Sequence, residues 1–254
     1  MNIRTKALFQ SVFNRFGYRI SAVSRVGLPE VEKVDPEFVP LFESCKPYTM
    51  TSPERMHALY QATHYVVDAN IPGDIVECGV WRGGSTMLVA NILKQKSSSK
   101  KIFLYDTFEG MSKPTEKDVE ISNGRPATEK WKNHIVNDST TWCYASLEEV
   151  SNNMAKTGYD TKKTVFVKGK VEDTIPDTVP DKISLLRLDT DWYDSSYHEL
   201  VHLFPLLSKG GVLLLDDYGQ WSGSREATDT YFKQNGITLL LNRIDFSGRI
   251  GIKS

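Results

Sequence analysis

Ile183-Ser184-Leu185-Leu186-Arg187-Leu188 is followed directly by Asp189, and Gly211-Val212-Leu213-Leu214-Leu215 is followed directly by Asp216-Asp217. Short, nearly unbroken apolar runs of this kind are typical of strands that are buried on both faces of a parallel sheet. The sequence therefore predicts two such strands, each with acidic residues at its carboxyl end.

A helix is predicted between these strands, from about Ser195 to Lys209. A crossover of this kind puts both carboxyl ends at the same edge of the sheet, where open α/β sheets bind ligands. Asp189, Asp216 and Asp217 should therefore converge. Carboxylates are ligands that Mg²⁺ takes while it keeps positions open for substrate oxygens. The pattern predicts a divalent-cation site and chemistry on a hydroxyl group.

Length and composition indicate an ordinary globular protein. The chain has 254 residues, a formal net charge of -1 and 40% hydrophobic residues, which suits one large α/β domain with an extension. This charge balance gives no sign of a nucleic-acid partner. Cys45, Cys78 and Cys143 have no metal-ligand spacing and fit a reducing compartment. No apolar run approaches the roughly 20 residues that cross a bilayer, so we expect a cytoplasmic protein.

The amino-terminal residues 1–29 carry basic but no acidic residues. Their apolar residues recur at helical spacing from Leu8 to Phe16, which predicts a basic amphipathic helix. Packing on the main domain or on a second subunit is the favoured interpretation and makes a homodimer plausible. Contact of residues 1–25 with an anionic membrane surface is the alternative. Residues 1–50 are predicted to be this helical extension followed by an irregular connector over 30–50.

The remaining pattern predicts a domain over residues 51–254. Residues 107–145 lack clear periodicity, and so long an insertion is usually a lid or a binding loop. A capping signal at Ser52-Pro53 predicts the start of a helix there. The other predicted helices cover residues 85–95, 146–155 and 224–234. Further strands are predicted over residues 74–79, 101–106, 164–167, 237–241 and, as an edge strand, 246–252.

The first predicted strand leads into a glycine-rich turn, Glu77-Cys78-Gly79-Val80-Trp81-Arg82-Gly83-Gly84. Its spacing differs from the Gly-x-Gly-x-x-Gly of dinucleotide-binding proteins, which argues against a bound pyrophosphate. Asp106 ends the second strand, where a carboxylate can bind ribose hydroxyls. Acidic residues at both places suit a ligand with an adenosine and an ammonium group but no phosphate. S-adenosylmethionine fits this description.

The chain resembles the macrocin O-methyltransferase (TylF-like) family of class I, S-adenosylmethionine-dependent sugar O-methyltransferases. The resemblance spans about residues 48–220 and implies a Rossmann-like, doubly wound, mostly parallel seven-stranded sheet with an antiparallel edge strand. The segments that carry it are Tyr48-Thr49-Met50-Thr51-Ser52, the run from Gly73 to Gly84, Asp106-Thr107-Phe108-Glu109-Gly110, Glu172-Asp173-Thr174-Ile175-Pro176, Leu188-Asp189-Thr190-Asp191-Trp192-Tyr193 and Asp216-Asp217-Tyr218.

The resemblance also implies roles for individual residues. Asp189, Asp216 and Asp217 would bind Mg²⁺, and Asp191 would be the general base, although a turn residue that caps the next helix is the alternative for Asp191. Trp192 stands where a smaller apolar residue is expected, in the region of the acceptor pocket. The residues implied to bind the cofactor are Thr49, Met50, Glu77, Gly79, Trp81, Asp106, Thr107, Ser146, Glu172, Asp173 and Asp189.

Other functions stay open at this point. Asp189-Thr190-Asp191 is a literal Asp-x-Asp pair, which a glycosyltransferase would use to hold a metal on a nucleotide-sugar. A chain that binds the cofactor but acts only as an assembly partner is a second alternative. Phenol methyltransferases use similar metal chemistry, but the resemblance favours a sugar hydroxyl as acceptor.

Three further motifs are given less weight. His134 is an alternative base. The pair His198 and His202 has the spacing of a two-histidine metal site but no third ligand nearby. Tyr159 and Lys163 match the Tyr-x-x-x-Lys motif of short-chain dehydrogenases. They precede the predicted strand over residues 164–167 instead of lying on a long helix after the following strand, so we discard this match.

Overall fold

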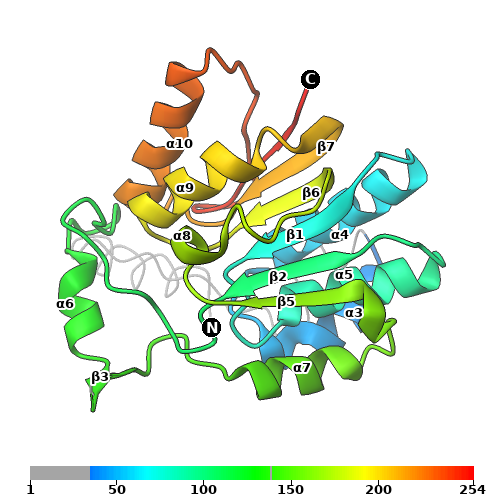
Figure 1. Cartoon of the computed structure of the whole chain (residues 1–254), viewed down its shortest axis with the longest axis horizontal. Helices are drawn as coiled ribbons and strands as arrows, with labels where there is room; N and C mark the ends of the chain where they lie inside the picture. The colour runs from blue at the N-terminus through cyan, green and yellow to red at the C-terminus, as the bar shows by residue number, and fades with distance from the viewer. Residues whose placement is uncertain (1–34, 138) are drawn as a thin grey trace, which may run out of the picture. The chain divides into compact units, whose positions relative to one another are not determined.

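The computed structural model describes residues 35–137 and 139–254, in which helices cover both faces of a central sheet (Figure 1). The predicted basic helix of residues 1–29, with its proposed membrane or subunit contact, lies outside the described residues. Residues 35–254 group as one compact unit.

The central sheet has seven strands in the order β5-β2-β1-β6-β7-β9-β8. The first five are parallel and the last two are antiparallel, which confirms the predicted mostly parallel sheet. These strands are β1 (Asp74–Cys78), β2 (Ile102–Asp106), β5 (Thr164–Lys168), β6 (Ile183–Leu188), β7 (Leu207–Leu215), β8 (Asn242–Arg243) and β9 (Arg249–Ile252). A separate two-stranded sheet pairs β3 (Ile135–Val136) with β4 (Ser139–Thr140).

Helix α4 begins where its capping signal predicts. In α4, Ser52 is the N-cap and its hydroxyl accepts from the backbone N–H of Arg55 at 3.2 Å. The helices are α3 (Phe38–Cys45), α4 (Pro53–Asp68), α5 (Gly84–Gln95), α6 (Ala127–Lys132), α7 (Leu147–Ala155), α8 (Val171–Thr174), α9 (Tyr193–Leu203) and α10 (Ser222–Gln234). Two 3-10 turns are η1 (Lys46–Tyr48) and η2 (Thr161–Lys163).

Strand alternation divides the residues of β1 and β6 between the two faces of the sheet. Val76 and Cys78 face the core that is shared with α9 and α10. Glu77 points to the opposite face, where Thr86 of α5 donates to it. Arg187 pairs in register with Glu77 and shares that face. The buried side chains of Glu77 and Arg187 therefore lie side by side, close to the carboxyl ends of their strands.

Two predictions about helices were wrong. Residues 38–48 form α3 and η1, although 30–50 was expected to be irregular. Pro40 falls in the first turn of α3, where a proline is tolerated, and Phe38 and Phe42 are buried at helical spacing. The helix expected to reach Lys209 ends at Leu203, because β7 already begins at Leu207.

The carboxyl-terminal prediction also needs correction. The expected strand over residues 237–241 does not form; strand pairing begins at Asn242, the residue after this range. The side chains of Ile237, Leu239 and Leu241 do pack on the core, which explains the apolar pattern without a hydrogen-bonded ladder. Strand β9 is not at the edge of the sheet, because β8 pairs with its outer side.

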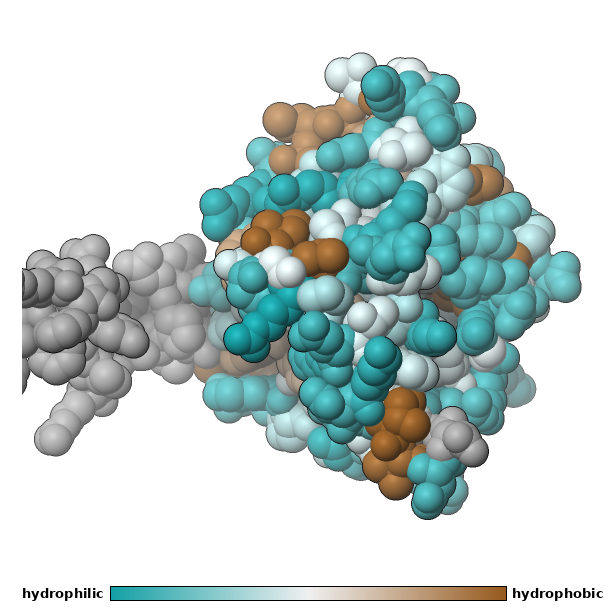
Figure 2. All heavy atoms as spheres, turned by 90° about the vertical axis from the view of Figure 1, so that its left-hand side faces the viewer, coloured by the Kyte–Doolittle hydropathy of each residue, from teal (hydrophilic) through white to brown (hydrophobic). Residues whose placement is uncertain are grey.

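Among the described residues, no helix has the length and hydropathy needed to cross a membrane. Large exposed apolar side chains include Leu240, Phe246 and Val136. On the face that Figure 2 draws, the surface is largely hydrophilic and its hydrophobic patches are small and separate.

Candidate active site

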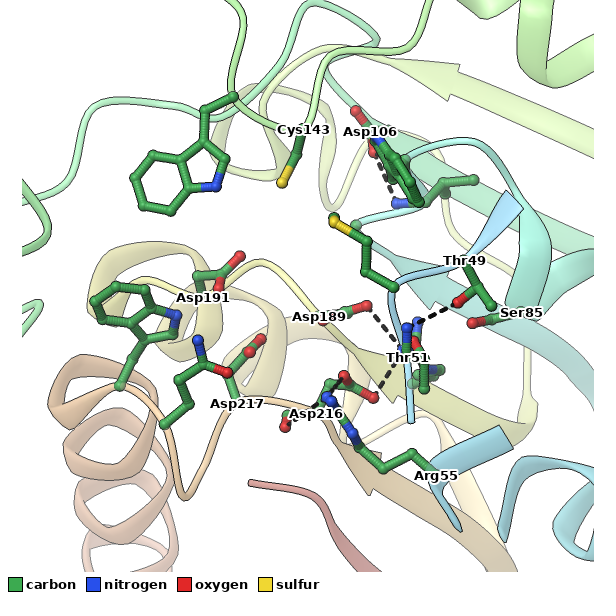
Figure 3. Close-up of a pocket in the computed structure, with 18 of the residues that line it drawn as sticks. Thr49, Thr51, Arg55, Ser85, Asp106, Cys143, Asp189, Asp191, Asp216 and Asp217 are labelled. Atoms are coloured by element: carbon green, nitrogen blue, oxygen red, sulfur yellow. Dashed lines mark hydrogen bonds and ion pairs between the residues drawn. The ribbon is translucent and has the colours of Figure 1, made fainter. Parts of the chain in front are cut away.

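A cavity of about 740 Å³ opens at the carboxyl edge of the sheet (Figure 3). It is lined by the ends of β1, β6 and β7, by residues 48–52 before α4, and by part of the insertion 107–145. The predicted site residues that line it are Thr49, Met50, Gly79, Trp81, Asp106, Asp189, Asp191, Asp216 and Asp217. The sheet topology thus brings together residues that are far apart in the sequence.

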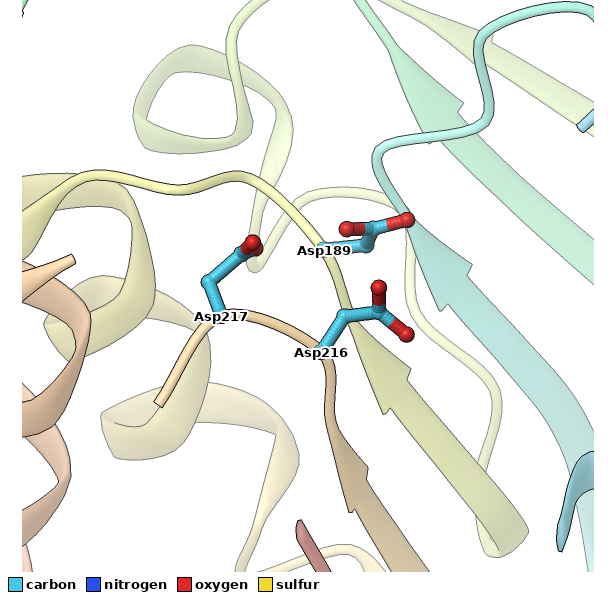
Figure 4. A group of neighbouring side chains, drawn as sticks. All are labelled: Asp189, Asp216 and Asp217. Carbon is cyan, nitrogen blue, oxygen red and sulfur yellow. The ribbon is translucent and has the colours of Figure 1, made fainter. Parts of the chain in front are cut away.

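Asp189, Asp216 and Asp217 form a compact acidic group (Figure 4). Each offers an oxygen, and these oxygens lie within 4.8 Å of one another. Burial, and then the charges of its acidic neighbours, raise the pKa of Asp217, and its buried Oδ2 has no hydrogen-bond partner in the described part of the chain. A buried carboxylate oxygen without a partner is unfavourable. Three oxygen donors with excess negative charge fit a hard divalent cation.

Two arginines that the sequence reasoning missed neutralise part of this acidic group. Arg187 Nη2 donates to Asp189 at 2.8 Å and to Asp216 at 2.7 Å, while its Nη1 donates to Glu77 at 2.5 Å. Arg55 Nη1 pairs with the other oxygen of Asp216. An arginine inside an apolar strand was the available signal for Arg187, because a buried charge needs partners. No pattern in the sequence singled out Arg55.

Asp191 lies in the loop between β6 and α9, with a positive φ of 67°. Its carboxyl group lines the cavity next to the acidic group (Figure 3). Burial, and then the charge of Asp189, raise the pKa of Asp191 to about 8. It does not cap α9: the first N–H of that helix, at Tyr193, donates to Oδ1 of Asp118 at 2.8 Å. The N-cap residue of α9 is Trp192, which makes no side-chain capping hydrogen bond, so the cap interpretation of Asp191 is wrong.

The glycine-rich turn is held by Asp106. Its Oδ2 accepts from the backbone N–H groups of Val80 at 2.7 Å and Trp81 at 3.0 Å, and its Oδ1 accepts from Phe108 at 2.8 Å. A carboxylate offers about four acceptor positions, so capacity for a further hydrogen bond remains. Asp106 borders both the main cavity and a smaller hollow. A ligand that lies against Asp106 could therefore extend into both.

Gly79 follows β1, at a point where the backbone lies directly against Asp189, the residue that follows β6. Its φ is +81°, and a Cβ there would overlap the carbonyl oxygen of Asp189. We expect Gly79→Ala to lower the free energy of unfolding by about 1–3 kcal/mol from backbone strain, with the overlap adding to that loss. Urea unfolding measures it. Gly124→Ala is the matched control, because Gly124 has a φ of +72° and no neighbour within 4 Å. Equal losses in both variants would contradict the close approach.

Five residues that the resemblance assigned to the cofactor do not line the main cavity. Thr107 and Glu172 border the smaller hollow instead. Ser146 is the N-cap of α7, where its hydroxyl accepts from Glu149 at 3.1 Å. Glu77 is 4% exposed and is occupied by Arg187 and Thr86. Asp173 is exposed on α8 and borders neither hollow.

Aromatic residues form part of the cavity wall. Trp142 and Trp221 line it, together with Lys130 and His134. Trp192, which stands where a smaller residue was expected, is 2% exposed and packs behind them at ring distances of 5.6 and 5.2 Å. Trp192 therefore supports the wall without forming its surface. The sequence did not reveal this cluster, because its members come from three separated segments.

Two of the three weaker motifs, the His198/His202 pair and the Tyr159/Lys163 pair, do not line the main cavity. His198 Nε2 bonds to the carbonyl oxygen of Ile175 at 2.9 Å, and among the described residues the acidic group is the one cluster suited to a metal. Tyr159 and Lys163 bond to carbonyls near Ser98. His134 does border the cavity, and its Nδ1 bonds to the carbonyl oxygen of Lys130 at 2.7 Å.

Comparison with known proteins identifies the family. The macrocin-O-methyltransferase (TylF) family model matches residues 40–250. Demethyldecarbamoylnovobiocin O-methyltransferase from Streptomyces niveus is 31% identical over 202 residues, covering 79% of this chain and 74% of that protein. The 8-demethyl-8-(2,3-dimethoxy-α-L-rhamnosyl)-tetracenomycin-C 4'-O-methyltransferase from Streptomyces olivaceus is 29% identical over 202 residues, covering 79% of this chain and 74% of that protein. The solved structure of the O-methyltransferase NovP matches with a TM-score of 0.71 and 28% identity, covering 82% of each chain.

The chain therefore belongs to the macrocin-O-methyltransferase (TylF) family, and it is an S-adenosylmethionine-dependent O-methyltransferase. The family prediction and the Rossmann-like methyltransferase fold are both confirmed.

Proposed function

We propose that this enzyme methylates a hydroxyl group of a sugar or of a glycosylated small molecule, and that the reaction depends on Mg²⁺ or a similar cation. The observation that carries the proposal is the cavity that joins the acidic group, Asp191 and the glycine-rich turn. The name of one relative supports a sugar acceptor, since that protein's substrate carries a rhamnosyl group. The aromatic wall offers apolar surface for a ring.

Asp189, Asp216 and Asp217 would hold the cation. A bound divalent cation supplies Lewis acidity, which lowers the pKa of a coordinated hydroxyl group. Asp191 would accept the proton of the acceptor hydroxyl, because it lies beside the acidic group and faces the same cavity.

S-adenosylmethionine supplies the electrophilic methyl group when it is bound. We place it across Asp106, with Thr49, Met50 and Trp81 in the main cavity. Thr107 and Glu172 would meet it in the smaller hollow, whereas Ser146 and Asp173 have no place in either. Glu77 would act through Arg187, which it holds beside Asp189.

The insertion 107–145 stays a predicted lid, although part of it is firmly attached. Asp118 is fully buried and accepts from the N-terminus of α9, and Val119 and Ile121 bond to residues 220–222. We expect any opening to involve the region around α6 and β3-β4. A homodimer and a cytoplasmic location also stay predictions.

The test is methyl transfer from labelled S-adenosylmethionine to a panel of nucleotide-sugars, free sugars and glycosides, with Mg²⁺ or with EDTA. The proposal expects label in an acceptor, and loss of that label with EDTA. Turnover of a UDP-sugar without S-adenosylmethionine binding would overturn it in favour of a glycosyltransferase. Cofactor binding with no transfer to any acceptor would favour the non-catalytic alternative.

A further inference from the structure

The two arginines beside the acidic group are held in different ways. Arg187 is 3% exposed, comes from the middle of the sheet and donates to Glu77 as well as to Asp189 and Asp216. Arg55 comes from the first turn of α4, borders the open cavity and donates to Asp216 alone among the three acidic-group members. The Arg187 side chain is enclosed within the sheet, whereas the Arg55 side chain is 11% exposed at the wall of the cavity.

Arg55 already has a second acidic partner, which is not part of the acidic group. Its Nε donates to Oδ2 of Asp245 at 3.0 Å. That oxygen also accepts from the hydroxyl of Ser52 at 2.7 Å, while Oδ1 accepts from the N–H groups of Ser247 at 2.8 Å and Gly248 at 2.7 Å. Asp245 is therefore anchored independently of Arg55, and its carboxylate stays in place whatever Arg55 does.

The loop 244–248 is shaped around the side chain of Arg55. A Cβ at Gly248 would lie 2.8 Å from both Cγ and Cδ of Arg55, so this position needs a glycine to leave room for the arginine. The same loop touches the acidic group directly, because the hydroxyl of Ser247 donates to the backbone carbonyl of Asp216 at 2.6 Å. The loop, Arg55 and Asp216 form one connected unit.

We propose that Arg55 is an exchangeable counter-ion of the metal site: it pairs with Asp216 while the cation is absent, and it keeps Asp245 as its partner when a cation takes Asp216. The inference rests on the proposed function, since it needs the acidic group to bind a metal. With this exchange, every buried carboxylate and every buried arginine of the site has a partner whether the cation is present or absent. A buried charge without a partner would be costly.

The exchange predicts opposite effects for two neighbouring residues. Arg55→Met removes a competing cation from Asp216, so Mg²⁺ should bind about tenfold more tightly. Asp245→Asn leaves Arg55 with Asp216 as its one ionised partner, so Mg²⁺ should bind about tenfold more weakly. Neither side chain is proposed to touch the metal.

Combining the substitutions separates exchange from a general field effect. If Asp245 acts through Arg55, then Asp245→Asn should change the Mg²⁺ affinity by less than about twofold once Arg55 is methionine. If both act only through their charges, the two effects will add and largely cancel. Additive effects would overturn the proposal.

The experiment is calorimetric titration of Mg²⁺ into the wild type, both single variants and the double variant, with thermal unfolding of each as a check on folding. Lys96→Met is the control for loss of a positive charge, because Lys96 pairs with Asp68 at the surface. Weaker Mg²⁺ binding by a folded Arg55→Met variant would refute the exchange. Absence of Mg²⁺ binding by the wild type would instead refute the metal site itself, so the two failures are distinguishable.

Discussion

Asp217→Asn should abolish Mg²⁺ binding and lower kcat by about 100-fold or more, while S-adenosylhomocysteine still binds. The variant removes the one member of the acidic group whose buried oxygen has no partner and whose carboxylate pairs with neither arginine. The folded structure should not suffer. Because burial and acidic neighbours raise the pKa of Asp217, its charge is unfavourable at pH 7, and the amide should leave the melting temperature unchanged or higher.

Asp189→Ala and Asp216→Ala should also lose metal-dependent activity and keep cofactor affinity. These variants have a second effect, because each takes an ion-pair partner from the buried Arg187. Breaking a buried pair costs about 3–5 kcal/mol of stability, so their activity losses must be read beside their unfolding curves. Asp194→Asn, at an exposed position on α9, is the control. A residual rate above a tenth of wild type in both alanine variants would refute the metal role.

Asp191→Asn should lower kcat by about 100- to 10,000-fold, the range for loss of a general base, without changing Mg²⁺ or cofactor affinity. The carboxyl group can accept a proton only when it is ionised. Its pKa of about 8 lies above the ordinary value, so the ionised fraction and kcat/KM should both rise as the pH rises through that range. Steady-state kinetics measured across pH will show this rise of kcat/KM with pH.

The pH range over which kcat/KM rises should depend on the bound cation. The charge of Asp189 helps to raise the pKa of Asp191, and a divalent cation at the acidic group opposes that charge. Raising the Mg²⁺ concentration from limiting to saturating should therefore shift the rise of kcat/KM to lower pH. Wild-type rates in Asp191→Asn would transfer the role of base to another residue, for which His134 borders the same cavity.

The carboxyl edge could be predicted from the sequence because parallel strands reveal themselves as apolar runs. Once two such runs and a crossover were recognised, Asp189 and Asp216 had to meet. Helix α3 was missed because Pro40 hid a helical repeat that a proline in the first turn does not break. The run 237–241 was misassigned because its alternation reflects packing of Ile237, Leu239 and Leu241 against the core, which also produces a period of two.

The charge balance of the site could be predicted only in part. Arg187 carried a signal, since a cation inside a buried strand implies acidic neighbours. The Arg55–Asp245 pair joins residues 190 positions apart, and nothing local to either residue indicates the other. Among the residues assigned to the cofactor through the resemblance, six line the main cavity: Thr49, Met50, Gly79, Trp81, Asp106 and Asp189. Ser146 does not, because its hydroxyl caps α7.

Calorimetric titration of Mg²⁺ into the wild-type enzyme saturated with S-adenosylhomocysteine tests the central claim most directly. The structure predicts one cation per chain, bound by Asp189, Asp216 and Asp217, and no binding after Asp217→Asn. Absence of binding to the wild type at millimolar Mg²⁺, or unchanged binding to the variant, would contradict a metal centre at the carboxyl edge of the sheet.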